Sequence, residues 1–130
     1  MQAAATFQIK SWDEKSYAEF EKGAQLTRAK ATQSFAGDME GEGSVEYLMF
    51  HRADSSANFV GLEHFVGKVG GRWGSFVIQH QGTFDKSTAR SSWTVVADSG
   101  TGELYGLRGE GSFVAPQGGQ ATVSFEYEID

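Results

Sequence analysis

Glu63 and His80 are the residues of this sequence whose types and spacing best suit acid–base chemistry. They flank the Gly-Gly dipeptide at 70–71, which is typical of a two-residue β-hairpin turn. The register of that hairpin would pair His80 with Gly61, which makes Glu63 and His80 diagonal neighbours on one face. Buried side by side, a carboxylate and an imidazole can share one mobile proton, as general acid–base catalysis requires. They can equally form a structural hydrogen-bonded pair, and the sequence leaves both interpretations open.

Other side chains on the same face would line a binding cavity. By strand alternation and turn length, these candidates are Glu46, Phe50, Phe59, Phe65, Phe76, Trp93, Arg108 and Tyr127. The placement of Glu46 and Phe50 assumes a four-residue turn at 54–57, because one residue more or fewer would turn their strand over. The placement of Trp93 opposite His80 depends in the same way on a turn at 85–88.

Arg108 is the one cation among these candidates. A four-residue loop at 116–119 would pair it with Tyr127 on an apolar, inward face. There it could pair with Glu63 or Glu46, or bind an anionic ligand. Alternatively, its stem covers apolar surface while its charge stays in solvent, and the sequence does not decide between the two.

No metal, nucleophile or nucleotide motif accompanies these residues. The chain has three histidines and no cysteine, and the histidines show no standard zinc-binding spacing. No serine lies on a strand–turn–helix elbow. The glycine-rich run 100–109 leads into a predicted strand, whereas a phosphate-binding loop must open a helix. We therefore expect no metal ion and no cofactor.

Strands would position all of these side chains. Two-residue alternation is clearest at 3–12 and 122–129. Further strands are predicted at 24–36, 43–52, 58–69, 72–84, 89–97 and 104–115. The acidic segment 13–23 is predicted as a solvated loop or, alternatively, as a flap over one barrel mouth. The sequence thus predicts an all-β fold with one domain, residues 1–130, forming an antiparallel closed barrel of about eight strands in a calycin-like meander.

The composition of the chain disfavours several classes of binding partner. The net charge is −6 and the basic residues are scattered, which disfavours nucleic acid and anionic membrane surfaces. No apolar run approaches the roughly 18 residues of a membrane-spanning helix. The first residues lack the basic and apolar regions of a signal peptide, so a cytoplasmic location is expected.

The opposite face of the central strands is predicted to be apolar as well. It would carry Tyr47, Met49, Val60, Leu62, Val66 and Val77. A monomeric barrel needs only an apolar inner face, so a second apolar face calls for a partner. We therefore expect a homo-oligomer joined through the strands near 43–52, 58–69 and 72–84.

Several motifs spread over nearly the whole chain carry a family resemblance. They lie at 11–14, 26–29, 59–63, 74–84, 93–96, 100–104 and 106–109. By these motifs the chain resembles an uncharacterised bacterial family, a domain of unknown function with the allene-oxide-cyclase-like barrel. The resemblance implies an eight-stranded barrel and names no activity.

The predicted function is binding of a small, largely apolar molecule as ligand inside the barrel. Isomerase, cyclase or lyase chemistry by Glu63 and His80 would be an extension of that function. A non-catalytic carrier or sensor would use the same cavity, and an oligomeric structural protein would have a filled barrel. The interior volume separates these alternatives, because about eight strands can be plugged by side chains or can hold one small ligand.

Overall fold

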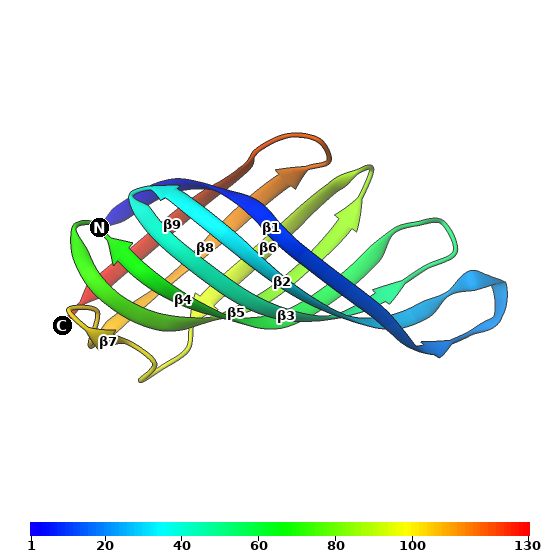
Figure 1. Cartoon of the computed structure of the whole chain (residues 1–130), viewed down its shortest axis with the longest axis horizontal. Helices are drawn as coiled ribbons and strands as arrows, with labels where there is room; N and C mark the ends of the chain where they lie inside the picture. The colour runs from blue at the N-terminus through cyan, green and yellow to red at the C-terminus, as the bar shows by residue number, and fades with distance from the viewer.

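Eight antiparallel strands close into a barrel in this protein (Figure 1). The computed structural model describes Met1 to Asp130. Its elements are β1 (Gln2–Glu19), η1 (Glu21–Gly23), β2 (Gln25–Gly37), β3 (Met39–His51), β4 (Ala57–Val69), β5 (Arg72–Asp85), β6 (Thr88–Val95), β7 (Thr101–Gly102), β8 (Leu107–Pro116) and β9 (Ala121–Ile129). The ring runs in chain order, β9 pairs back with β1, and the short β7 pairs with β5 outside the ring. This arrangement confirms the predicted closed antiparallel barrel.

The chain contains hardly any helix. Its single helical element, η1, is a turn of three residues between β1 and β2. The structure therefore contains no helix with the length and apolar character that spanning a membrane would require.

Side chains fill the half of the barrel that ends at the predicted Gly-Gly turn, 70–71. Met39 and Leu104 are completely buried there, and Leu104 comes from the connection between β6 and β8. Aromatic side chains fill the adjoining layers, namely Phe35, Phe65, Phe76, Trp93, Phe125 and Tyr127. Glycine provides room among them, because a Cβ at Gly111 would overlap the ring of Trp93. This half of the barrel is a packed core.

The first strand is longer than predicted. The segment 13–23, predicted as a loop or flap, continues β1 as far as Glu19 and pairs with β2. A β-bulge between Ile9 and Ser11 interrupts the two-residue alternation, so the prediction of a loop was wrong. Pairing with β9 ends at Phe7, and beyond it β1 and β2 extend past the end of the barrel (Figure 1). The barrel is therefore open on one side of this end.

The outer face of the central strands is only partly as predicted. Val60, Leu62 and Val66 on β4 face outward and are about half exposed. Tyr47 and Met49 on β3 are buried, so their predicted outward placement was wrong. The homo-oligomer expected through this face stays a prediction.

Candidate functional site

Glu63 on β4 and His80 on β5 lie side by side inside the barrel, as predicted. The β4–β5 register pairs His80 with Gly61, which confirms the hairpin turn at 70–71. With Glu63 ionised, Nε2–H of His80 donates a hydrogen bond to Oε1 of Glu63 over 2.7 Å. The hydroxyl of Ser91 on β6 lies 2.9 Å from Nδ1 of His80. All three residues are at most 3% exposed, so the pair is shielded from solvent. Both imidazole nitrogens have partners within the chain.

Two polar atoms next to this pair lack hydrogen-bond partners. They are the second carboxylate oxygen of Glu63 and the hydroxyl of Tyr47. The Glu63 carboxylate fits only because Gly43 on β3 has no side chain, since a Cβ there would collide with it. Burial, reinforced by the charge of Glu63, raises the pKa of the Tyr47 phenol well above its ordinary value, and the nearby Gln33 amide offsets only part of that rise. Tyr47 therefore stays neutral, and its hydroxyl keeps unused hydrogen-bonding capacity.

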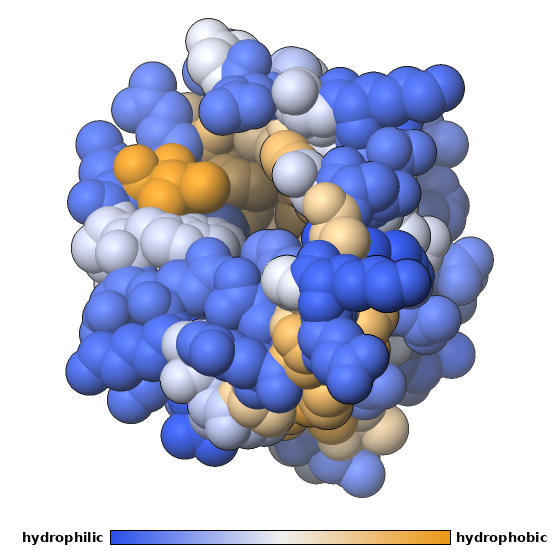
Figure 2. All heavy atoms as spheres, turned by 90° about the vertical axis from the view of Figure 1, so that its right-hand side faces the viewer, coloured by the Kyte–Doolittle hydropathy of each residue, from blue (hydrophilic) through white to orange (hydrophobic).

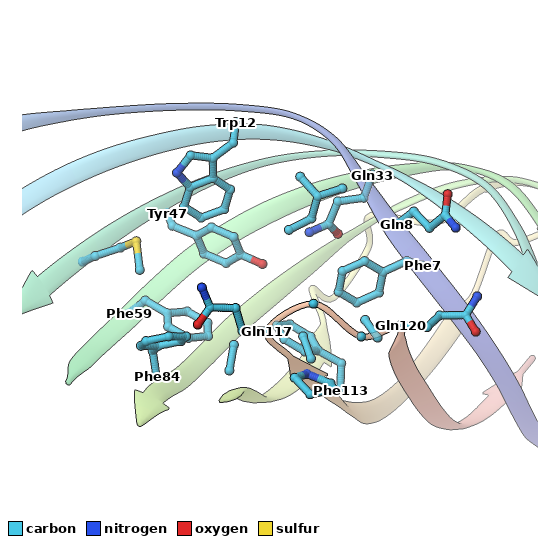
Figure 3. Close-up of a pocket in the computed structure, with 18 of the residues that line it drawn as sticks. Phe7, Gln8, Trp12, Gln33, Tyr47, Phe59, Phe84, Phe113, Gln117 and Gln120 are labelled. Atoms are coloured by element: carbon cyan, nitrogen blue, oxygen red, sulfur yellow. The ribbon is translucent and has the colours of Figure 1, made fainter. Parts of the chain in front are cut away.

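A pocket of about 760 Å³ opens at the other end of the barrel. Its lining consists of Phe7, Gln8, Ile9, Trp12, Glu14, Gln33, Tyr47, Met49, His51, Phe59, Phe84, Ala89, Phe113, Ala115, Pro116, Gln117, Gly118, Gly119, Gln120 and Ala121. Figure 2 looks into this end and shows a hollow with apolar residues at its base and mostly hydrophilic residues around it. In Figure 3 the rings of Phe7, Tyr47, Phe59 and Phe113 surround the pocket. The open half of the barrel thus contrasts with the packed half.

The buried pair lies beneath the floor of this pocket. Neither Glu63 nor His80 contributes to the lining. The ring of His80 lies 5.6 Å from the ring of Tyr47 and 5.6 Å from that of Phe113, both of which do line the pocket. A molecule in the pocket would therefore be separated from the pair by these two rings.

A second pair of glutamate and histidine lies at the mouth of the pocket. Nε2 of His51 on β3 is 2.7 Å from Oε2 of Glu14 on β1. The hydroxyl of Thr27 donates to the same oxygen over 2.7 Å, and Nε1–H of Trp12 donates to Oε1 over 2.9 Å. The side chains of Glu14 and His51 are 26% and 27% exposed. Partial burial raises the pKa of Glu14, but these hydrogen bonds outweigh it and hold the pKa below its ordinary value.

The other residues predicted to bind a ligand divide into two groups. Phe59, Phe65, Phe76, Trp93 and Tyr127 face the interior, as predicted, and all are buried. Only Phe59 among them lines the pocket, and the other four belong to the packed half.

Glu46 and Phe50 lie on the outer face, so their predicted inward placement was wrong. The connection 52–56 has five residues where four were predicted, and the odd length turns β3 over. Glu46 forms an exposed ion pair with Arg28, with 3.8 Å between Oε1 and Nε. The ring of Phe50 packs against that of Phe20, 6.2 Å away.

Arg108 also lies outside the barrel, so its predicted inward placement was wrong. The β8–β9 register pairs it with Glu128 and not with Tyr127, because the connection around 116–119 is one residue out of step with the predicted turn. Its guanidinium donates hydrogen bonds to Glu128 over 3.2 Å and to Asp130 over 2.7 Å. The alternative of a strand arginine with its charge in solvent is the correct one.

The pair at the mouth, Glu14 and His51, was not predicted from the sequence. The predicted register turned His51 outward, on the same side of its strand as Tyr47 and Met49, and Glu14 fell in the segment predicted as a loop. Each error comes from one unrecognised residue. The fifth residue of the connection 52–56 turns β3 over, and the extra residue in the bulge of β1 interrupts the alternation of that strand. Trp12 and Glu14 lie two residues apart and so share one face of a strand. This spacing indicates that both face inward only if a bulge before Trp12 is assumed.

Comparisons with known proteins give a family and a fold but no activity. A family model described as "Protein of unknown function (DUF3224)" matches residues 3–127. A solved structure of a DUF3224 protein of unknown function from Shewanella oneidensis is similar, with a TM-score of 0.85 and 32% identity over 100% of this chain and 98% of that one. No curated protein matches the sequence.

Proposed function

This chain belongs to the DUF3224 family, whose function is unknown, and we propose that it binds a small, uncharged, largely apolar molecule at the open end of its barrel. The observation that carries the proposal is the pocket of about 760 Å³ with its aromatic walls. Ligand pockets of small molecules usually have volumes of about 300–1,000 Å³, apolar walls and a few polar groups that fix orientation. Most of the walls are strand residues of a closed barrel, which favours a pocket formed before the ligand arrives.

The polar groups of the lining favour an uncharged ligand. The lining contains no lysine or arginine, so a carboxylate or phosphate would find no cation there. Its one carboxylate and its one imidazole, Glu14 and His51, are already paired with each other. Four glutamines remain, and their amides offer neutral donors and acceptors: Gln8, Gln33, Gln117 and Gln120. A hydroxyl or carbonyl group on an apolar body matches these groups best.

Catalysis by the buried pair remains a separate hypothesis. Glu63 and His80 lie beneath Tyr47 and Phe113, so a ligand in the pocket would not touch them. Binding does not require the pair, and a carrier or sensor would use the pocket in the same way as an enzyme.

Two dyes that differ in a single charge test the proposal. N-Phenyl-1-naphthylamine is uncharged, and 1-anilinonaphthalene-8-sulfonate adds one sulfonate to the same skeleton. A fluorescence titration should show binding of the uncharged dye and at least about tenfold weaker binding of the anionic one, a difference of about 1.4 kcal/mol. Equal or tighter binding of the anionic dye would contradict the preference for uncharged ligands.

A matched pair of variants locates the bound dye. Ala115→Trp fills the pocket from β8, while Val114→Trp places the same side chain on the outer face of the same strand. We expect Ala115→Trp to weaken binding of the uncharged dye at least about tenfold, and Val114→Trp to leave it unchanged. Unchanged binding in Ala115→Trp would show that the dye binds elsewhere and would refute the proposal.

A further inference from the structure

We propose that His51, oriented by Glu14, is a catalytic base in this pocket and that it removes a proton from a carbon atom next to a carbonyl group. The proposal rests on the proposed function, since it needs a molecule in the same pocket. It assigns a substrate class, an uncharged apolar ketone or related carbonyl compound, and places the chemistry at the mouth and not at the buried pair.

The hydrogen bonds around Glu14 determine which nitrogen of His51 is basic. Thr27, Trp12 and His51 together give the Glu14 carboxylate three donors, which keep it ionised. An ionised carboxylate 2.7 Å from Nε2 requires a proton on that nitrogen. In the neutral ring the lone pair is then on Nδ1. A carboxylate that fixes the tautomer of an imidazole is the arrangement that orients histidine bases in hydrolases.

Nδ1 of His51 has no hydrogen-bond partner and is therefore available to accept a proton. It forms no hydrogen bond within the chain, and it is absent from the polar atoms that are buried without a partner. His51 lines the pocket and its Nδ1 is accessible, so this is the nitrogen that the proposal assigns to the ligand. His80 differs in this respect, because Ser91 occupies its Nδ1 and the ring is sealed. Of the two Glu–His pairs, only the one at the mouth can exchange a proton with a ligand.

The step balances without any co-reactant. Nδ1 takes the proton, the C–H bond breaks, and its electron pair forms the C=C bond of an enolate whose charge rests on oxygen. The Glu14 carboxylate stabilises the imidazolium that results. Side-chain amides of the pocket, such as Gln33, can donate N–H to the enolate oxygen. Return of the proton to the same carbon gives exchange with solvent, and return to a conjugated carbon gives an isomer.

The test uses 2-tetralone, an uncharged aromatic ketone with acidic α-hydrogens. Binding is measured by displacement of N-phenyl-1-naphthylamine, and exchange of the α-hydrogens in D₂O is followed by proton NMR. We expect the protein to accelerate exchange by about 10²-fold or more over buffer, the usual range for general base catalysis. His51→Asn should reduce the rate to that of buffer, while the dye still binds.

Glu14 is a positioning residue in this proposal, so its variant must separate rate from binding. Glu14→Gln should slow exchange at least about tenfold while the dissociation constant of 2-tetralone changes by no more than about twofold. The matched controls are His64→Asn and Glu46→Gln, which make the same changes on the outer face and should leave both readouts unchanged.

Each outcome decides between the two proposals. Binding with accelerated exchange that His51→Asn abolishes supports the catalytic base. Binding without accelerated exchange, or with exchange that His51→Asn leaves intact, overturns the catalytic base and leaves the binding pocket standing. Failure of both 2-tetralone and the uncharged dye to bind overturns the proposed function, and the catalytic base with it.

Discussion

Two Glu–His pairs in one barrel share the same contact and differ in almost everything around it. In both, Nε2 of the histidine lies 2.7 Å from a carboxylate oxygen. The side chains of Glu63 and His80 are 1% and 2% exposed, whereas those of Glu14 and His51 are 26% and 27% exposed. Both nitrogens of His80 have partners, while one nitrogen of His51 has none.

The difference teaches that the contact itself does not determine the role of such a pair. The side chains of Glu63 and His80 cannot form hydrogen bonds with water because they are buried, so each depends on the other for a partner. Glu14 and His51 can be hydrated, so the fold depends on them little and chemistry can use them. Stability should therefore be sensitive to the buried pair, and ligand chemistry to the pair at the mouth.

The largest expected effect is that of removing the buried carboxylate. Glu63→Ala leaves His80 without its partner and opens a cavity, and it should lower the free energy of unfolding by about 3–5 kcal/mol. The control Glu46→Ala removes an exposed ion pair and should cost less than about 1 kcal/mol. Urea denaturation measures both. Similar values for the two variants would mean that burial does not distinguish these glutamates.

A smaller effect is expected from freeing the second nitrogen of the buried histidine. Ser91→Ala removes the partner of Nδ1 in His80 and should cost about 1–3 kcal/mol, because the nitrogen stays buried and unsatisfied. Ser92→Ala, on the outward side of the same strand, should cost less than about 0.5 kcal/mol. The same urea measurements apply. A loss in Ser91→Ala no larger than in Ser92→Ala would show that the buried pair tolerates a free nitrogen as readily as the pair at the mouth.

The smallest effect is expected at the mouth, and it should depend on pH. The pKa of Glu14 is lower in the folded chain than its ordinary value of 4.5, so its carboxylate stabilises the fold above that value, and the contribution disappears as pH falls through the folded pKa. Glu14→Gln should therefore cost less than about 1 kcal/mol near neutral pH and nothing at an acid pH below the folded pKa of Glu14. Unfolding of both proteins at the two pH values gives the comparison. A cost that persists at the acid pH would mean that packing, not charge, is lost.

The sequence predicted the buried pair correctly and missed the pair at the mouth for one physical reason. The Gly-Gly turn at 70–71 has a defined geometry, so it fixes the register of β4 and β5 and places Glu63 beside His80. Longer connections and bulges have no such signature. Because the side chains of a strand alternate with a period of two, a single unrecognised residue exchanges its inner and outer faces. On β3 this exchange wrongly placed His51 on the outer face and Glu46 on the inner face.

The bulge in β1 also bears on how the pocket can diverge among relatives. Its extra residue lies between Ile9 and Ser11, and the regular ladder resumes with Ser11 opposite Thr32, followed by Trp12 opposite Ala31. A relative that lacked this residue would still direct Trp12 inward, but its strand would lose the bend that a bulge imposes. The width of the mouth and the groups that face it can thus evolve separately. Deletion of this one residue would change the shape of the mouth without replacing the residues that line it.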